Sequence, residues 1–187
     1  MPQLKSRWQF AISSGASLIA MFFVAMTPSY AQWVARATGP DVFGNEKVIA
    51  LVPDRSGNTL VVQCNQKNSL YVAIISRGTQ NELNDLSESS GLPAKLLVRV
   101  DQGKVEKFNA KLKQWNTKYL GIVAANRDQN LVELLHSIGS ARSQISVGTD
   151  VMGSQDTASF GVLGSRNAME AVIKHCKLSG VTAPPAP

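Results

Sequence analysis

Residues 47–76 read KVIALVPDRSGNTLVVQCNQKNSLYVAIIS, and this stretch decides the fold class. It contains three apolar runs of strand length, separated by the segments 53–57 (PDRSG) and 65–68 (NQKN). β-branched residues favour strands, whereas proline, glycine, aspartate and asparagine favour turns. The stretch therefore predicts consecutive antiparallel strands in a β-rich domain. In the second run Leu60, Val62 and Cys64 share one face, so the cysteine is expected to point into the core.

The β-pattern extends in both directions from this stretch. The segment 78–91 (GTQNELNDLSESSG) interrupts it; this segment is polar, has only Leu83 and Leu86 to anchor it, and predicts a long exposed loop. Tight turns and alternating apolar residues predict further strands at 33–37, 96–101, 105–110, 119–123, 144–148 and 158–162.

Two segments carry a helical pattern. In the first, Asp128 is a candidate N-cap, Gly139 marks the end, and the apolar residues between them follow the spacing of one helix face, at Leu131, Leu134, Leu135 and Ile138. In the second, Ser165 is the candidate cap, and Ala168, Val172 and Cys176 share a face. The expected fold is α+β, with an antiparallel sheet or sandwich of about eight to ten strands and two packed helices, one of them near the C-terminus.

The first 31 residues have the features of a secretory signal peptide. Lys5 and Arg7 precede an apolar run at 16–26, and the small residues of 29–31 (SYA) predict cleavage before Gln32. An uncleaved membrane anchor is the alternative, but the apolar run is shorter than the roughly 20 residues that span a bilayer. The expected organisation is therefore a signal peptide at 1–31, a single exported domain at 32–178 and a disordered proline-rich tail at 179–187. We expect a periplasmic or secreted protein without stable membrane insertion.

Export determines how the two cysteines are interpreted. In an oxidising compartment an isolated pair is expected to be bonded, so the sequence predicts a disulfide between Cys64 and Cys176. The alternative is a catalytic Cys176 activated by His175. Adjacent helical residues point about 100° apart, so this geometry does not support the pair.

The charge balance is mildly basic. The 187 residues carry 19 Lys and Arg against 13 Asp and Glu, and removal of the signal peptide leaves an excess of four positive charges. Five lysines gather on one expected hairpin, at Lys104, Lys107, Lys111, Lys113 and Lys118. No aromatic stacking pattern accompanies them, so we expect a solvated surface and no nucleic-acid partner.

Motifs for catalysis or cofactor binding are absent from the sequence. It lacks a nucleophile elbow, a P-loop, a dinucleotide-binding fingerprint and a zinc-protease helix, so we expect no catalytic residue, cofactor or metal. Arg99 and Asp101 share a strand face where they could form an ion pair, and with Trp115 they are the candidate surface cluster. A hydrolase built on paired carboxylates stays open as an alternative; its candidate residues are Asp101, Glu106, Asp150 and Asp156.

The order of these features resembles a known family. The residues that carry the resemblance are Trp33, 48–51 (VIAL), 60–64 (LVVQC), 71–72 (YV), 98–101 (VRVD), Trp115, Ala141 and 160–176 (FGVLGSRNAMEAVIKHC). Together they resemble the type VI secretion-associated VasI/TagO-like proteins, and the end segment is also similar to the invasion-associated locus B family. The first resemblance implies an exported, non-enzymatic accessory domain with a β-rich core and a cysteine of the sheet paired with one in the last helix.

Two function classes follow from the sequence. The first is a periplasmic or secreted accessory protein that binds an envelope or secretion-system protein. The second is an exported hydrolase acting on a cell-wall polymer or glycan. A free sheet edge or an exposed apolar patch would favour the binding protein, whereas a cleft with two convergent carboxylates would favour the enzyme.

Overall fold

The computed structural model describes residues 32–39, 42, 46–65, 69–87, 91–126 and 129–178. The expected signal peptide at 1–31, the tail at 179–187 and the expected cap Asp128 lie outside these residues. The strands are β1 (Val34–Thr38), β2 (Lys47–Pro53), β3 (Thr59–Asn65), β4 (Leu70–Arg77), β5 (Leu92–Val100), β6 (Glu106–Asn116), β7 (Tyr119–Asn126), β8 (Ile145–Val151) and β9 (Ser154–Phe160). The helices are α1 (Gln80–Ser87), α2 (Gln129–Ser140) and α3 (Ser165–His175).

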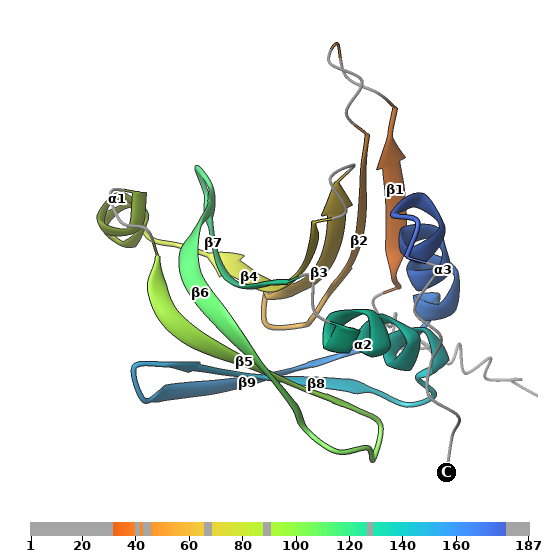
Figure 1. Ribbon diagram of the computed structural model, residues 1–187. Coiled ribbons are helices and arrows are strands. Elements are labelled where there is room, and N and C mark those ends of the chain that lie inside the picture. The colour runs from red at the N-terminus through yellow and green to blue at the C-terminus, as the bar shows by residue number, and fades with distance from the viewer. Residues whose placement is uncertain are drawn as a thin grey trace, which may run out of the picture.

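The nine strands form a single antiparallel sheet in the order β1-β2-β3-β4-β7-β6-β5-β8-β9. The sheet curls around α2, and α3 packs beside α2 near β1 (Figure 1). The α+β class and the β-rich antiparallel sheet predicted from the sequence are confirmed. Of the two expected forms, a sheet or a sandwich, the structure has a single curled sheet, and the described residues contain three helices instead of two.

The core lies between the concave face of the sheet and the helices α2 and α3. The apolar stripe predicted for α2 is buried completely, with Leu131, Leu134, Leu135 and Ile138 all 0% exposed. Strand residues of alternating positions, such as Leu60 and Leu96, meet this stripe. The alternation follows from the period of two of a strand with one face on a core.

A disulfide joins Cys64, near the end of β3, to Cys176 at the C-terminus of α3. The two Cα atoms are 6.2 Å apart and both side chains are almost fully buried. The bond is the one predicted from the sequence, and it excludes the pairing of a free Cys176 thiol with His175. A buried disulfide is consistent with folding in an oxidising compartment.

The prediction of a long loop at 78–91 is wrong, because α1 forms within it. Thr79 and Glu82 make a capping box, in which the Glu82 carboxylate accepts hydrogen bonds from the Thr79 backbone N–H at 2.8 Å and its hydroxyl at 2.7 Å. These bonds hold the pKa of Glu82 below its usual value. Leu83 and Leu86, three positions apart, bury one side of the helix in a small apolar cluster with Leu120.

The helix ends also differ from the expected ones. Gly164 is the N-cap of α3, at a φ of 79° that favours glycine, and Ser165 is the first helical residue, buried and without a side-chain capping bond. Gly139 lies inside α2, which continues to Ser140. No described helix has the length and apolar character that crossing a bilayer requires.

Candidate functional site

Trp33 bridges the two edges of the curled sheet. β1 is one edge strand and β9 is the other. The backbone N–H of Trp33 donates to the Leu163 carbonyl at 2.9 Å, and its indole Nε1 donates to the Gly161 carbonyl at 2.9 Å. Because Gly161 follows β9 directly and Trp33 directly precedes β1, Trp33 ties the ends of the two edge strands together.

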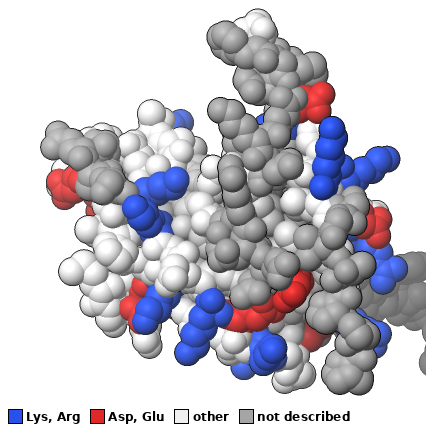
Figure 2. All heavy atoms as spheres, in the orientation of Figure 1, with Lys and Arg blue, Asp and Glu red and all other residues white. Residues whose placement is uncertain are grey.

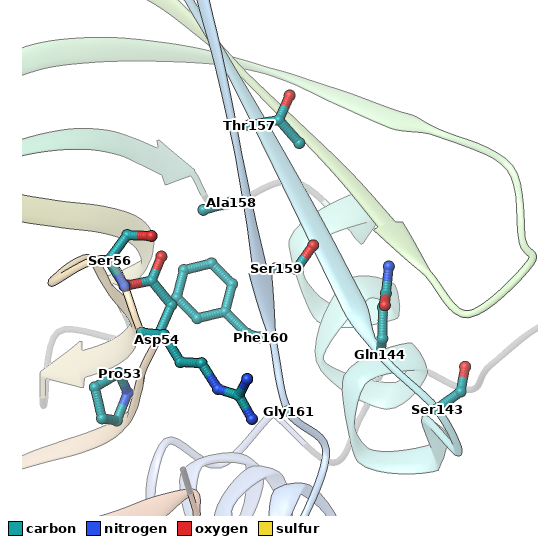
Figure 3. A pocket seen from close by; sticks show the side chains of 11 residues that line it. Pro53, Asp54, Ser56, Ser143, Gln144, Thr157, Ala158, Ser159, Phe160 and Gly161 are labelled. Carbon is teal, nitrogen blue, oxygen red and sulfur yellow. The ribbon is translucent and has the colours of Figure 1, made fainter. Parts of the chain in front are cut away.

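Beyond this bridge the two edges separate and leave a groove. β1 begins at Val34 opposite Leu51, whereas β2 continues to Pro53, so the end of β2 has no β1 partner. A groove of about 630 Å³ lies here. It is lined by the β2–β3 turn (53–56), by 143–144 before β8, and by 157–161 along β9. Figure 3 shows the turn residues Pro53, Asp54 and Ser56 on one side of β9, and Ser143 and Gln144 on the other.

The turn that forms the first wall is held by Asp54. Its carboxylate accepts hydrogen bonds from the backbone N–H groups of Ser56 and Asn58, each at 2.8 Å, and from the Asn58 side-chain amide at 2.9 Å. A carboxylate that satisfies two backbone donors of its own turn fixes the turn's shape. This wall is therefore formed before any ligand arrives.

The second wall is held by Asp101. Its carboxylate accepts bonds from the backbone N–H groups of Arg142 (2.9 Å), Ser143 (2.7 Å) and Gln144 (3.1 Å) and from the Ser143 hydroxyl (2.7 Å). These bonds, led by the one from the Ser143 hydroxyl, hold the pKa of Asp101 far below its usual range. Asp101 is thus a positioning residue for the two groove residues of this wall.

The Asp101→Ala variant is expected to unfold at a lower temperature than the wild type and to admit faster hydrogen exchange at residues 142–144. The pKa of Asp101 is lower in the folded than in the unfolded protein. The ionised carboxylate therefore contributes its full stabilisation at pH values above the pKa of the unfolded state. The effect is lost as the pH falls from there toward the folded pKa. The difference in thermal unfolding midpoint between wild type and Asp101→Asn should therefore shrink below about pH 4. Asp85→Asn, at an exposed position of α1, is the control. An equal drop in the unfolding midpoint of this control would contradict the positioning role of Asp101.

The floor of the groove includes the free edge of β9. The β8–β9 hairpin has a two-residue turn, Met152–Gly153, with φ values of 52° and 89° that are typical of a type I′ turn. In such a hairpin Val151 and Ser154 form a hydrogen-bonded pair, and hydrogen-bonded pairs then alternate with non-bonded ones along the strands. The register therefore turns the backbone groups of Thr157 and Ser159 away from β8, toward the open edge.

One of these outward-facing backbone groups already has a side-chain partner. The Thr157 N–H donates to the Asp156 carboxylate at 2.7 Å. Ser159 is the next outward-facing position, and by the same register its N–H and carbonyl point toward the open edge. Ser159 thus offers a donor and an acceptor in the groove, which an added strand would pair.

The candidate cluster of Arg99, Asp101 and Trp115 does not form one site around a ligand. Asp101 directs its carboxylate to the loop before β8 and not to Arg99. Trp115 lies on the face of the sheet opposite the helices, where its ring would be 3.3 Å from a Cβ at Gly121. The role of Asp101 has no local sequence signal, because its partners follow 41 to 43 positions later.

Two of the three other candidate carboxylates, Asp150 and Asp156, serve local structure. Asp150 accepts a bond from the Gly153 N–H in the β8–β9 turn at 3.0 Å, and Asp156 accepts the Thr157 bond described above. Burial raises the pKa of Glu106, and the nearby Glu133 carboxylate raises it further. The only carboxylate among the lining residues of the groove is that of Asp54.

Metal-binding clusters are not found among the described residues, where no three His, Cys, Asp or Glu side chains are arranged to hold an ion. His175 instead contacts Glu46, with 3.3 Å between Nε2 and Oε2. No protein-family model, curated protein or solved structure matches this chain.

Proposed function

We propose that the protein is an exported, non-enzymatic accessory protein, periplasmic or secreted, that binds an extended segment of an envelope or secretion-system protein along the free edge of β9. In this mode a partner segment adds a tenth strand to the sheet. Its backbone pairs with Ser159, and its side chains contact the two walls of the groove. The partner class follows from the predicted export and from the resemblance to the VasI/TagO-like family.

The observation that carries this proposal is the position of the groove on a sheet edge. Exposed edges promote unwanted pairing, and proteins usually block them with charges, prolines or bulges. The four β9 residues along the groove, Thr157, Ala158, Ser159 and Phe160, are uncharged, and Gly161 follows them directly. The walls on either side are held by Asp54 and Asp101, so binding requires little ordering of the site.

A Ser159→Pro variant is expected to abolish capture of the partner. Proline removes the outward N–H, while the bonds between β8 and β9 stay intact because residue 159 does not donate to β8. The measurement is photo-crosslinking in the exporting cell, with a photoreactive amino acid in place of Thr157. We expect discrete crosslinks to an envelope protein, which disappear with Ser159→Pro.

Two controls separate strand addition from adhesion to the surface. Ser159→Ala keeps the backbone N–H and should retain the crosslink. The photoreactive residue placed instead of Asp85, on α1, should give none. Capture that survives Ser159→Pro, or that is equal from both positions, would rule out the β9 edge as the binding site.

A further inference from the structure

The face of the sheet that points away from α2 and α3, which we call the outer face, has an apolar centre. Strand register aligns Leu51, Val61, Ala73 and Val123 in one row across β2, β3, β4 and β7. Around this row the same alternation places further apolar side chains, namely Ile49, Tyr71, Ile75 and Trp115. The central residues Val61, Ala73 and Val123 are at most 3% exposed, and the surrounding ones are half-buried.

Gly121 leaves room for the Trp115 ring beside this apolar centre. A Cβ at this position would lie 3.3 Å from atoms of Ile75, Val123 and the Trp115 ring. Because glycine has none, the indole can lie against the strand. Trp115 and Tyr71 are therefore part of the apolar surface.

Cations surround the apolar centre. Lys111 pairs with Val123 and Lys113 with Gly121 in the register of β6 with β7, so both lysines directly border it. By strand alternation the outer face carries the cations Arg36, Lys47, Arg77, Lys95, Arg99, Lys107, Lys111 and Lys113. Along the described strands, the alternation places only one carboxylate on this face, that of Asp150 opposite Lys95.

This charge distribution differs from that of the opposite side. In the view of Figure 2, where α2 lies in front of the strands, acidic and basic side chains are interspersed. The modest net charge of the chain is thus unevenly distributed. The solvated basic surface expected from the sequence does not account for cations that surround an apolar patch.

Possible occupants differ in how well they fit both features. A second copy of the chain would bring two basic surfaces together, and like charges across an interface cost several kcal/mol. A soluble polyanion would satisfy the lysines but make no contact that uses the half-buried apolar side chains of the centre. An anionic lipid surface fits both, since lysines bind the headgroups while tryptophan, tyrosine and aliphatic side chains favour the interfacial region.

We propose that the outer face is a peripheral membrane-binding surface that docks on bilayers containing anionic lipids. This role is separate from the β9 groove and does not depend on a protein partner. It requires no spanning segment, because the apolar centre only contacts the interface.

The test uses purified disulfide-bonded protein that begins at Gln32, mixed with vesicles. Equimolar phosphatidylglycerol and phosphatidylcholine vesicles should sediment the protein at about 50 mM salt, and binding should weaken at about 500 mM salt. Pure phosphatidylcholine vesicles should bind it much less. Lys111→Gln together with Lys113→Gln should weaken binding by about thirtyfold, since each lysine near an anionic surface contributes about a fivefold effect.

A matched charge control and a depth measurement complete the test. Lys174→Gln with Lys177→Gln removes two exposed charges at the end of α3, away from the outer face, and should change binding little. Brominated lipids should quench Trp115 fluorescence, and a Trp115→Phe variant should lose this quenching because the remaining Trp33 is buried. The proposal would be overturned if the protein did not bind the vesicles, or if both double lysine variants lost binding equally. It would also be overturned if brominated lipids did not quench Trp115 fluorescence. Dimers that bury the outer face would also overturn it. Binding to duplex DNA that is as tight as binding to the vesicles, and that Lys111→Gln with Lys113→Gln abolishes, would overturn it too.

Discussion

Changing Cys64 and Cys176 together to alanine is expected to lower the free energy of unfolding by about 4 to 5 kcal/mol. The two residues are 112 positions apart, so their bond removes a large share of the conformational freedom of the unfolded chain. The bond also attaches α3 to β3 at a position where both cysteines are buried. The measurement is urea unfolding of the wild type and the variant, followed by circular dichroism.

Reduction provides the matching control for this substitution. Wild type unfolded in the presence of a reductant should lose a similar free energy, whereas the double-alanine variant should be unaffected by the reductant. A double variant as stable as the oxidised wild type would show that helix packing alone holds α3 in place.

The Trp33→Ala variant is expected to lose about 3 to 5 kcal/mol, the range observed when a buried tryptophan is truncated. Trp33 is 4% exposed, packs in the main core, and donates its indole N–H to the Gly161 carbonyl. Its loss leaves a cavity between β1 and the segment after β9. Because Gly161 also lines the groove, we expect faster hydrogen exchange at 157–161 in this variant.

Trp33→Phe separates packing from hydrogen bonding. It keeps most of the buried apolar surface but removes the donor to Gly161, so a smaller loss of about 1 to 2 kcal/mol is expected. Chemical denaturation of both variants gives the comparison. If Trp33→Ala were as stable as wild type, the bridge between the two sheet edges would have no energetic importance.

Local patterns were sufficient to predict most of the strands and the cysteine pair. The run at 47–76 is punctuated by strong turn formers, and the stripe from Leu131 to Ile138 matches one helix face. The sequence shows that residues 48–52 are nearly all apolar, but it does not show why both faces of this strand are apolar. Only the register shows that Ile49 and Leu51 belong to a second apolar face.

Features that depend on distant partners could not be predicted in this way. Asp101 bonds to a loop that follows α2, and Ser159 becomes an open edge only because β8 pairs with β5 on its other side. The helix α1 is a different case. Its capping box, Thr79 with Glu82, and the spacing of Leu83 and Leu86 were both present in the sequence, but the polar composition of the segment outweighed them.

The pairing of β4 with β7 has a consequence for biogenesis. Synthesis from the N-terminus delivers β1 to β4 first, yet the neighbour that completes β4 is β7, the last strand of the next meander. During this interval the four-stranded ribbon β1-β2-β3-β4, which is strongly apolar, has an open edge at β4, a situation that promotes aggregation. The cysteine that bonds Cys64 arrives later still, after α3. Efficient production of this protein therefore requires protection of the emerging chain, and the disulfide forms only after Cys176 has been made.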